Sequence, residues 1–276
     1  MQFSKRLDRF GDEIFAALNN RRIELEAQGM KIYNMSVGTP DFKTPEYIKK
    51  AVAEAAMDDN NWKYSLRDLP ELLDSVCIYY KKRFDVELTP DMVMTVYGSQ
   101  EGMGHLGMTL CDEGDTVLLP DPCYPVFAAG SLMAGAVPYY YPLVAEHDFL
   151  PYVKEIPEEV AKKAKYMVVS LPSNPVGSIA TPGLYEEIVE FAKKYDILII
   201  HDNAYSDIIF DGAFGARADI LCDRQSRVGT LARKARGALF PAGRGRRRAA
   251  AERVPAARKR PGLYRAGRGG RPERPV

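Results

Sequence analysis

Short apolar runs alternate with helical segments between residues 91 and 212, and this alternation is the strongest constraint on the fold. Parallel strands need long crossover connections, which are usually helices. The alternation therefore predicts an α/β protein with a mostly parallel sheet and helices on both faces. The predicted strands are 92–97, 116–119, 137–141, 166–170 and 197–201.

The last of these runs carries the most informative polar residues. Ile197-Leu-Ile-Ile leads into His-Asp-Asn-Ala-Tyr, so Asp202 stands at the carboxyl end of a buried strand and Tyr205 follows three residues later. Ligands of open α/β sheets bind at this edge. A carboxylate there can face a cationic ring nitrogen, and a phenol can reach the same space. The alternative is that Asp202 only caps the next turn and Tyr205 only packs.

Three earlier loops are predicted to reach the same edge. Ser99 and Gln100 follow a glycine between a predicted strand and a helix, an arrangement that binds phosphate through free N–H groups and the helix dipole. Tyr124 lies in a loop stiffened by three prolines and offers an aromatic plane. Asn174 is an amide that can donate to an oxyanion. Tyr124 could instead only cover the core.

The four loops together offer an anion nest, an aromatic plane, an amide donor, and a carboxylate with a phenol. A ligand that uses all of them has a phosphate, a flat ring, a phenolate oxygen and a protonated ring nitrogen. Pyridoxal 5'-phosphate has these four features. A carboxylate beside the ring nitrogen keeps that nitrogen protonated, so that the ring can accept electrons from the substrate.

Six motifs in order resemble the class I/II aminotransferases of the aspartate aminotransferase fold: SVGTPDF, KYS, GSQEG, PDPCYPVF, PSNPVG and HDNAYSDI. Within that family they are most similar to the aspartate and LL-diaminopimelate aminotransferase-like branch. The resemblance covers about residues 1–212. It implies a fold type I enzyme that uses pyridoxal 5'-phosphate to move an amino group from an amino acid to a 2-oxo acid, and that works as a homodimer.

The resemblance also implies roles for residues in the first half of the chain. Gly38 would lie in the loop that touches the substrate carboxylate. Tyr64 would reach the cofactor phosphate of the partner subunit. Ser99 and Gln100 would line the phosphate nest, and Tyr124 would stack on the cofactor ring.

In the second half, the resemblance implies that Asn174 and Tyr205 bind the phenolate oxygen and that Asp202 binds the ring nitrogen. The family also needs a lysine in an SxxK-like context, some tens of residues beyond Asp202, which forms the Schiff base and moves a proton. It further needs one arginine for the phosphate and a later one for the substrate carboxylate. None of these motifs is present in the sequence. Lys234 stands at a comparable distance, but it lies between arginines in a segment without strand character. We therefore expect this chain to be inactive as an enzyme.

The composition changes abruptly near residue 212. Residues 1–212 hold 20 Lys and Arg against 33 Asp and Glu, whereas residues 213–276 hold 18 against 4 and are rich in Arg, Ala, Gly and Pro. The second stretch has too few large apolar residues for a core. We expect a truncated family protein with an arm and substrate loop in 1–42 and a partial cofactor-binding domain in 43–212. The tail would be mostly disordered and either the product of a wrong reading frame or a foreign extension, with the small C-terminal domain missing.

Two other functions fit parts of the sequence. Residues 102–107 (GMGHLG) match GxGxxG, and Asp121 stands near the place of a ribose-binding acid, as in NAD-dependent dehydrogenases. Against this, the glycines fall inside a predicted helix and not in the turn before it. The basic tail, with Arg244–Arg248 and Arg258–Arg260, could bind nucleic acid. It has few aromatic residues for stacking on bases.

The cysteines and histidines show no pattern of disulfides or metal binding. The four cysteines have no close pairing or metal-ligand spacing, and the three histidines form no HExxH-like cluster. The amino terminus has no apolar signal region, and no run of eighteen apolar residues occurs. We expect a cytoplasmic protein without a metal, a membrane partner or a nucleic-acid partner.

Overall fold

The computed structural model describes residues 2–11, 14–35 and 42–210. In this part of the chain the strands are β1 (Thr116–Asp121), β2 (Val137–Pro142), β3 (Ala164–Ser170) and β4 (Leu198–Asp202). The α-helices are α1 (Ile14–Ala27), α2 (Glu46–Ala56), α3 (Pro70–Phe84), α4 (Ser99–Leu110), α5 (Val126–Ala134), α6 (Glu158–Ala161) and α7 (Leu184–Tyr195). Short 3-10 turns are η1 (Lys5–Arg9), η2 (Asp59–Trp62), η3 (Pro90–Met92), η4 (Ala145–His147) and η5 (Val153–Glu155). None of the helices in these ranges is long and apolar enough to cross a membrane.

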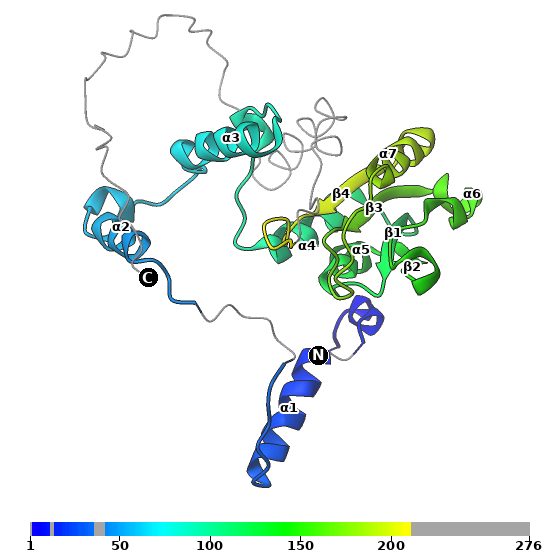
Figure 1. The fold of residues 1–276 in the computed structure, drawn as a ribbon, viewed down its shortest axis with the longest axis horizontal. Coiled ribbons are helices and arrows are strands. Elements are labelled where there is room, and N and C mark those ends of the chain that lie inside the picture. The colour runs from blue at the N-terminus through cyan, green and yellow to red at the C-terminus, as the bar shows by residue number, and fades with distance from the viewer. Residues whose placement is uncertain (1, 12–13, 36–41, 211–276) are drawn as a thin grey trace, which may run out of the picture. The chain divides into compact units, whose positions relative to one another are not determined.

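The four strands form one parallel sheet in the order β2-β1-β3-β4 (Figure 1). Helix α5 connects β1 to β2, and helix α7 connects β3 to β4. These helices are the crossover connections that parallel strands require. The predicted α/β class with a parallel sheet is confirmed.

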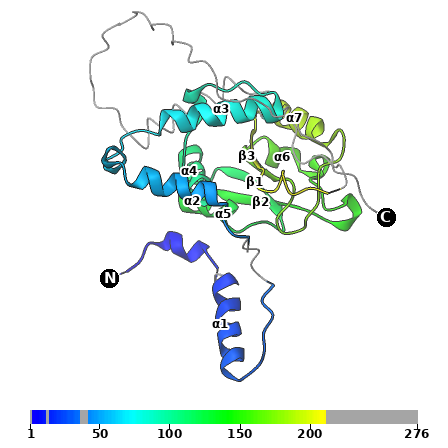
Figure 2. The same ribbon diagram turned by 60° about the vertical axis from the view of Figure 1, so that its left-hand side comes forward.

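Both faces of the sheet are covered by helices. Successive side chains of a strand point to opposite faces, so the central strands β1 and β3 contribute to two apolar clusters. The cluster on the α4–α5 side includes Val117, Leu119, Phe127, Tyr166 and Val168. The cluster on the α7 side includes Leu118, Met167, Val169, Tyr185 and Ile188. Figures 1 and 2 show the strands between α7 and the α4–α5 pair. Burial on both faces explains why the sequences of these strands are almost entirely apolar.

Helices α4 and α5 approach each other as closely as glycine permits. A Cβ atom added at Gly107 would lie 2.2 Å from the carbonyl carbon of Gly130, and one added at Gly130 would lie 2.3 Å from the carbonyl oxygen of Gly104. No side chain fits at such distances, so these positions require glycine. Since α4 begins at Ser99, the whole GMGHLG segment lies inside the helix. Of its three glycines Gly107 is needed for helix packing, and none of them forms the phosphate-binding turn of a dinucleotide site.

One predicted strand is wrong. Residues 93–97 form no strand; they follow η3 and lead to Gly98, which precedes α4. Tyr97 at the end of this apolar run is fully exposed. An apolar run becomes a strand only when a neighbouring strand accepts its backbone hydrogen bonds. In the described sheet the other four predicted runs pair with one another, and residues 93–97 pair with none of them.

We predict that Gly107→Ala lowers the free energy of unfolding by about 1–3 kcal/mol, because the new methyl group would overpack the contact with α5. Gly104→Ala is the matched control, since a Cβ there meets no atom within 4 Å. Both changes improve helix propensity by roughly 1 kcal/mol, so only the packing differs. Urea unfolding of the full chain, followed by circular dichroism, measures the difference; equal stability of the two variants would contradict the close contact.

Candidate active site

The carboxyl ends of β3 and β4 lie side by side because the two strands are parallel. Ser170 is the last residue of β3, Asp202 is the last residue of β4, and the two are paired in register. The Ser170 hydroxyl donates to Oδ2 of Asp202 at 3.3 Å. Asp202 therefore lies at the carboxyl edge of the sheet, where open α/β sheets in general bind their ligands.

The carboxylate of Asp202 is partly withdrawn from solvent. Burial raises its pKa above the ordinary value, while hydrogen bonds from the Ser170 hydroxyl and the Ala204 backbone N–H act in the opposite direction. A cationic group placed beside this carboxylate would favour the ionised form. The site is thus suited to a ligand that brings its own positive charge.

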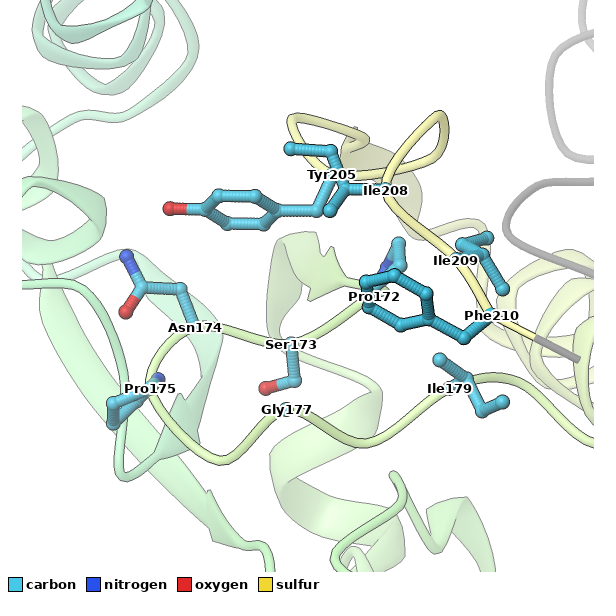
Figure 3. Close-up of a pocket in the computed structure, with 10 residues that line it drawn as sticks. All are labelled: Pro172, Ser173, Asn174, Pro175, Gly177, Ile179, Tyr205, Ile208, Ile209 and Phe210. Atoms are coloured by element: carbon cyan, nitrogen blue, oxygen red, sulfur yellow. The ribbon is translucent and has the colours of Figure 1, made fainter. Parts of the chain in front are cut away.

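A pocket of about 540 Å³ opens between the loop after β3 and the segment after β4 (Figure 3). The Tyr205 ring extends across the pocket, and its hydroxyl lies on the same side as the amide of Asn174. Ile179 and Phe210 line the other end. The pocket therefore has a polar end, with an amide and a phenol, and an apolar end.

The loop that carries Asn174 is held by its own backbone. The Ser173 N–H donates to the Ser178 oxygen at 2.9 Å, and the Gly177 N–H donates to the Ser173 oxygen at 2.8 Å. Gly177 adopts a φ of 76°, which favours glycine. These bonds close a tight turn and keep the Asn174 amide at the pocket wall.

A second group of predicted residues meets at the start of α4. Gln100 lies in the first turn of the helix, next to Ser99, and its side-chain amide donates to the Tyr124 hydroxyl. Tyr124 also packs edge-on against Phe127, with ring centroids 5.9 Å apart. The first-turn N–H groups of α4 are the donors that an anion needs.

The remaining predicted residues lie elsewhere or outside the described ranges. Tyr64 follows η2 and is 90% exposed. Gly38, Lys234 and the predicted tail of residues 213–276 lie outside the described residues.

Comparisons with known proteins identify the family. The LL-diaminopimelate aminotransferase of Aquifex aeolicus is 41% identical over 209 residues, and that of Dehalococcoides mccartyi is 39% identical over 214 residues. These alignments cover 75% and 77% of this chain, and 54% and 55% of the two relatives. Residues 30–233 match the aminotransferase class I and II family. The chain belongs to this family.

Solved aminotransferase structures have the same fold. Alanine aminotransferase from Pyrococcus furiosus matches with a TM-score of 0.72 and 29% identity, over 78% of this chain and 55% of that chain. An aspartate aminotransferase double mutant from Thermus thermophilus matches with a TM-score of 0.77 and 20% identity, over 87% of this chain and 69% of that chain. At 20% identity the second likeness concerns the fold alone.

The chain spans about half the length of the curated aminotransferases it matches. The predicted resemblance is confirmed, although the family match runs past the change of composition near residue 212 and ends just before Lys234. Class I and II aminotransferases depend on pyridoxal phosphate. None of these matches supports the dehydrogenase or the nucleic-acid alternative.

Sequence reasoning missed two residues that form hydrogen bonds between the carboxyl ends of β3 and β4. One is Ser170, discussed above. The other is His201, whose Nε2 lies 3.2 Å from the Leu171 oxygen and 3.4 Å from the Tyr185 hydroxyl. Nε2 must carry the proton in order to donate to that carbonyl, which leaves the buried Nδ1 as an acceptor with no partner among the residues that the structure describes. Both residues stand at the ends of predicted parallel strands. Aligning those strand ends could have indicated that Ser170 and His201 form hydrogen bonds across the β3–β4 pair.

We predict that stability depends on the protonation of His201. Burial lowers the pKa of His201 to about 4, from an ordinary value of 6.5. Between these values the unfolded chain binds a proton that the folded chain does not, so the free energy of unfolding rises with pH in this window. The stability that comes from keeping His201 neutral is fully present above pH 6.5 and is lost as the pH falls to about 4. Its size is of order 1.4 kcal/mol for each unit of pKa difference.

Urea unfolding across this pH window tests the prediction. His201→Gln, whose amide can still donate to the Leu171 oxygen, should lose most of the slope. His105→Gln, which removes a histidine from α4, should keep it. The raised pKa of Asp202 makes the free energy of unfolding fall as the pH rises. Both variants retain Asp202, so this effect cancels when their slopes are compared. Equal slopes in the two variants would show that His201 does not titrate as proposed.

Proposed function

We propose that this chain forms the cofactor-binding part of a pyridoxal-phosphate-dependent aminotransferase, which moves an amino group from an amino acid to a 2-oxo acid. One observation carries the proposal: Asn174 and Tyr205 line one pocket at the carboxyl edge of the sheet, and Asp202 ends the strand that leads to it. Membership of the aminotransferase family supports the same assignment.

The residues at this edge have the donors and acceptors that the cofactor needs. Asp202 is a partly buried carboxylate, suited to the protonated ring nitrogen. The Asn174 amide and the Tyr205 hydroxyl are donors suited to the phenolate oxygen. When bound, the cofactor supplies an electron sink for the substrate α-carbon. The protein's part is to hold the proton on the ring nitrogen through Asp202 and to balance the charge on the phenolate through two neutral donors.

The phosphate is assigned to the amino terminus of α4. Ser99 and Gln100 supply N–H groups there, and the dipole of a twelve-residue helix favours an anion. Gln100 donates to Tyr124, and this contact keeps the aromatic ring next to the proposed phosphate site. The stacking of Tyr124 on the cofactor ring is part of the proposal.

Two further assignments come from the family resemblance. The exposed Tyr64 would contact the phosphate held by a second subunit in a homodimer. Gly38 would lie against the substrate carboxylate. A cytoplasmic location, expected from the cysteine pattern, completes the proposal; the described cysteines Cys77, Cys111 and Cys123 are free thiols.

We predict that the chain binds pyridoxal phosphate and that Asn174→Ala and Tyr205→Phe each weaken the affinity about ten-fold or more. A hydrogen bond to a charged group contributes roughly 1.5–3 kcal/mol, and a factor of ten corresponds to about 1.4 kcal/mol. Fluorescence titration measures the dissociation constant.

Tyr195→Phe is the matched control for Tyr205→Phe. Tyr195 ends α7, just before β4 begins, and therefore lies at the opposite edge of the sheet. Titration with NADH tests the alternative of a dinucleotide site. Binding of NADH with no binding of pyridoxal phosphate would overturn the proposal.

We also predict that this chain binds the cofactor without forming a covalent bond to it and without transferring amino groups. The reason is that residues 1–276 contain no lysine in the context that the family uses. After borohydride reduction with the cofactor, mass spectrometry should find no lysine adduct. LL-diaminopimelate, the amino acid in the names of the relatives above, should transfer no amino group to a 2-oxo acid. An adduct on Lys234 together with turnover would contradict this prediction.

A further inference from the structure

Strand β3 ends in a buried hydroxyl that an apolar core does not need. Met167, Val168 and Val169 are fully buried, and Ser170, which follows them, is only 5% exposed. A buried hydroxyl without a partner is costly, so its partner is informative. That partner is the carboxylate of Asp202.

The pairing of β3 with β4 fixes this contact. Ser170 and Asp202 are aligned in the parallel ladder, and side chains at aligned positions lie on the same face of a sheet. The ladder continues one residue further, since the Leu171 N–H donates to the Asp202 backbone oxygen at 3.3 Å. The backbone on both sides of the contact is thus held in place, and the hydroxyl can reach Oδ2 without any loop having to order.

We propose that Ser170 is a positioning residue for Asp202, whose hydroxyl holds one carboxylate oxygen at the sheet edge so that the remaining acceptor sites face a cationic ligand group. An ionised carboxylate has about four acceptor sites, and within the described part of the chain two of them are used, by the Ser170 hydroxyl and the Ala204 N–H. The identity of the cationic group as the cofactor ring nitrogen rests on the proposed function. The contact between Ser170 and Asp202 does not.

The groups around Asp202 explain why a single hydroxyl matters. Burial raises the pKa of Asp202, and the Ser170 hydroxyl and the Ala204 N–H are the groups that lower it. The titratable residues that lie near Asp202 in the sequence are His201 on the same strand and Tyr205 in the segment that follows. His201 pairs with Val169, one position back along the ladder, and so lies on the opposite face from Asp202.

Two pairs of variants separate the hydroxyl from the shape of the side chain. Ser170→Thr keeps a hydroxyl and Ser170→Val has nearly the same shape without it, so any steric cost is shared. Ser170→Ala removes the hydroxyl without adding bulk. Ser131→Ala is the control for a lost buried hydroxyl, because Ser131 is also fully buried and donates to the Ala128 oxygen within α5.

The first measurement is the pKa of Asp202 in the cofactor-free chain, followed by carboxyl carbon NMR and assigned with Asp202→Asn. Ser170→Ala and Ser170→Val should raise this pKa by about one unit, since a hydrogen bond to a charged group contributes roughly 1.5–3 kcal/mol and this bond is long. Ser170→Thr and Ser131→Ala should leave it near the parent value. If Val and Thr shift it equally, or if Ala does not shift it, the proposal is wrong.

The second measurement separates this proposal from the proposed function. Affinity for pyridoxal phosphate is measured for Ser170→Ala, Asp202→Asn and the double variant. Ser170→Ala should weaken binding several-fold in the parent and add nothing in the Asp202→Asn background. If Asp202→Asn itself leaves affinity unchanged, the proposed cofactor role of Asp202 fails, while the NMR result still decides the role of Ser170. Equal effects of Ser170→Ala in both backgrounds would overturn the positioning role.

Discussion

The hydrogen-bonded parallel pairing of β1, β3 and β4 is the constraint on which the rest of this structure depends. Because the strands run in one direction, their carboxyl ends meet at one edge. Residues far apart in the sequence thereby become neighbours: Ser170 and Asp202 are 32 positions apart, yet they are aligned in the ladder. The pocket with Asn174 and Tyr205 lies in the loops that leave this same edge.

Burial on both faces of the sheet makes this edge rigid and also sets its electrostatics. Apolar residues from α5 and α7 seal the central strands, so polar groups near the strand ends lose part of their hydration. The same desolvation raises the pKa of Asp202 and lowers that of His201. Each of these polar groups is compensated by a hydrogen bond along the β3–β4 pair. The packing of the core therefore also sets the pKa values of the polar groups at the candidate site.

The sequence predictions succeeded for features set by local patterns and failed for features that depend on contacts between distant segments. Four of the five predicted strands are present, because short apolar runs flanked by helices have few other ways to be buried. The run at 92–97 is also apolar and is no strand, because apolar character does not say whether a neighbouring strand will pair with it. The GMGHLG segment matches a dinucleotide motif, yet it lies within α4, and its Gly107 allows α4 and α5 to touch. Closely spaced glycines permit the close approach of either a ligand or another helix, and a short motif does not show which of the two is present.

The sequence by itself determined the α/β class, the family, and the candidates Tyr64, Ser99, Gln100, Tyr124, Asn174, Asp202 and Tyr205, because local patterns of apolar, glycine, proline and polar residues carry that information. Only the tertiary structure decided which residues meet. It placed Asn174 with Tyr205, Gln100 with Tyr124, and Ser170 with Asp202. The reason is that strand order, register and helix contact arise from the burial and hydrogen bonding of the whole chain, and not from any single segment.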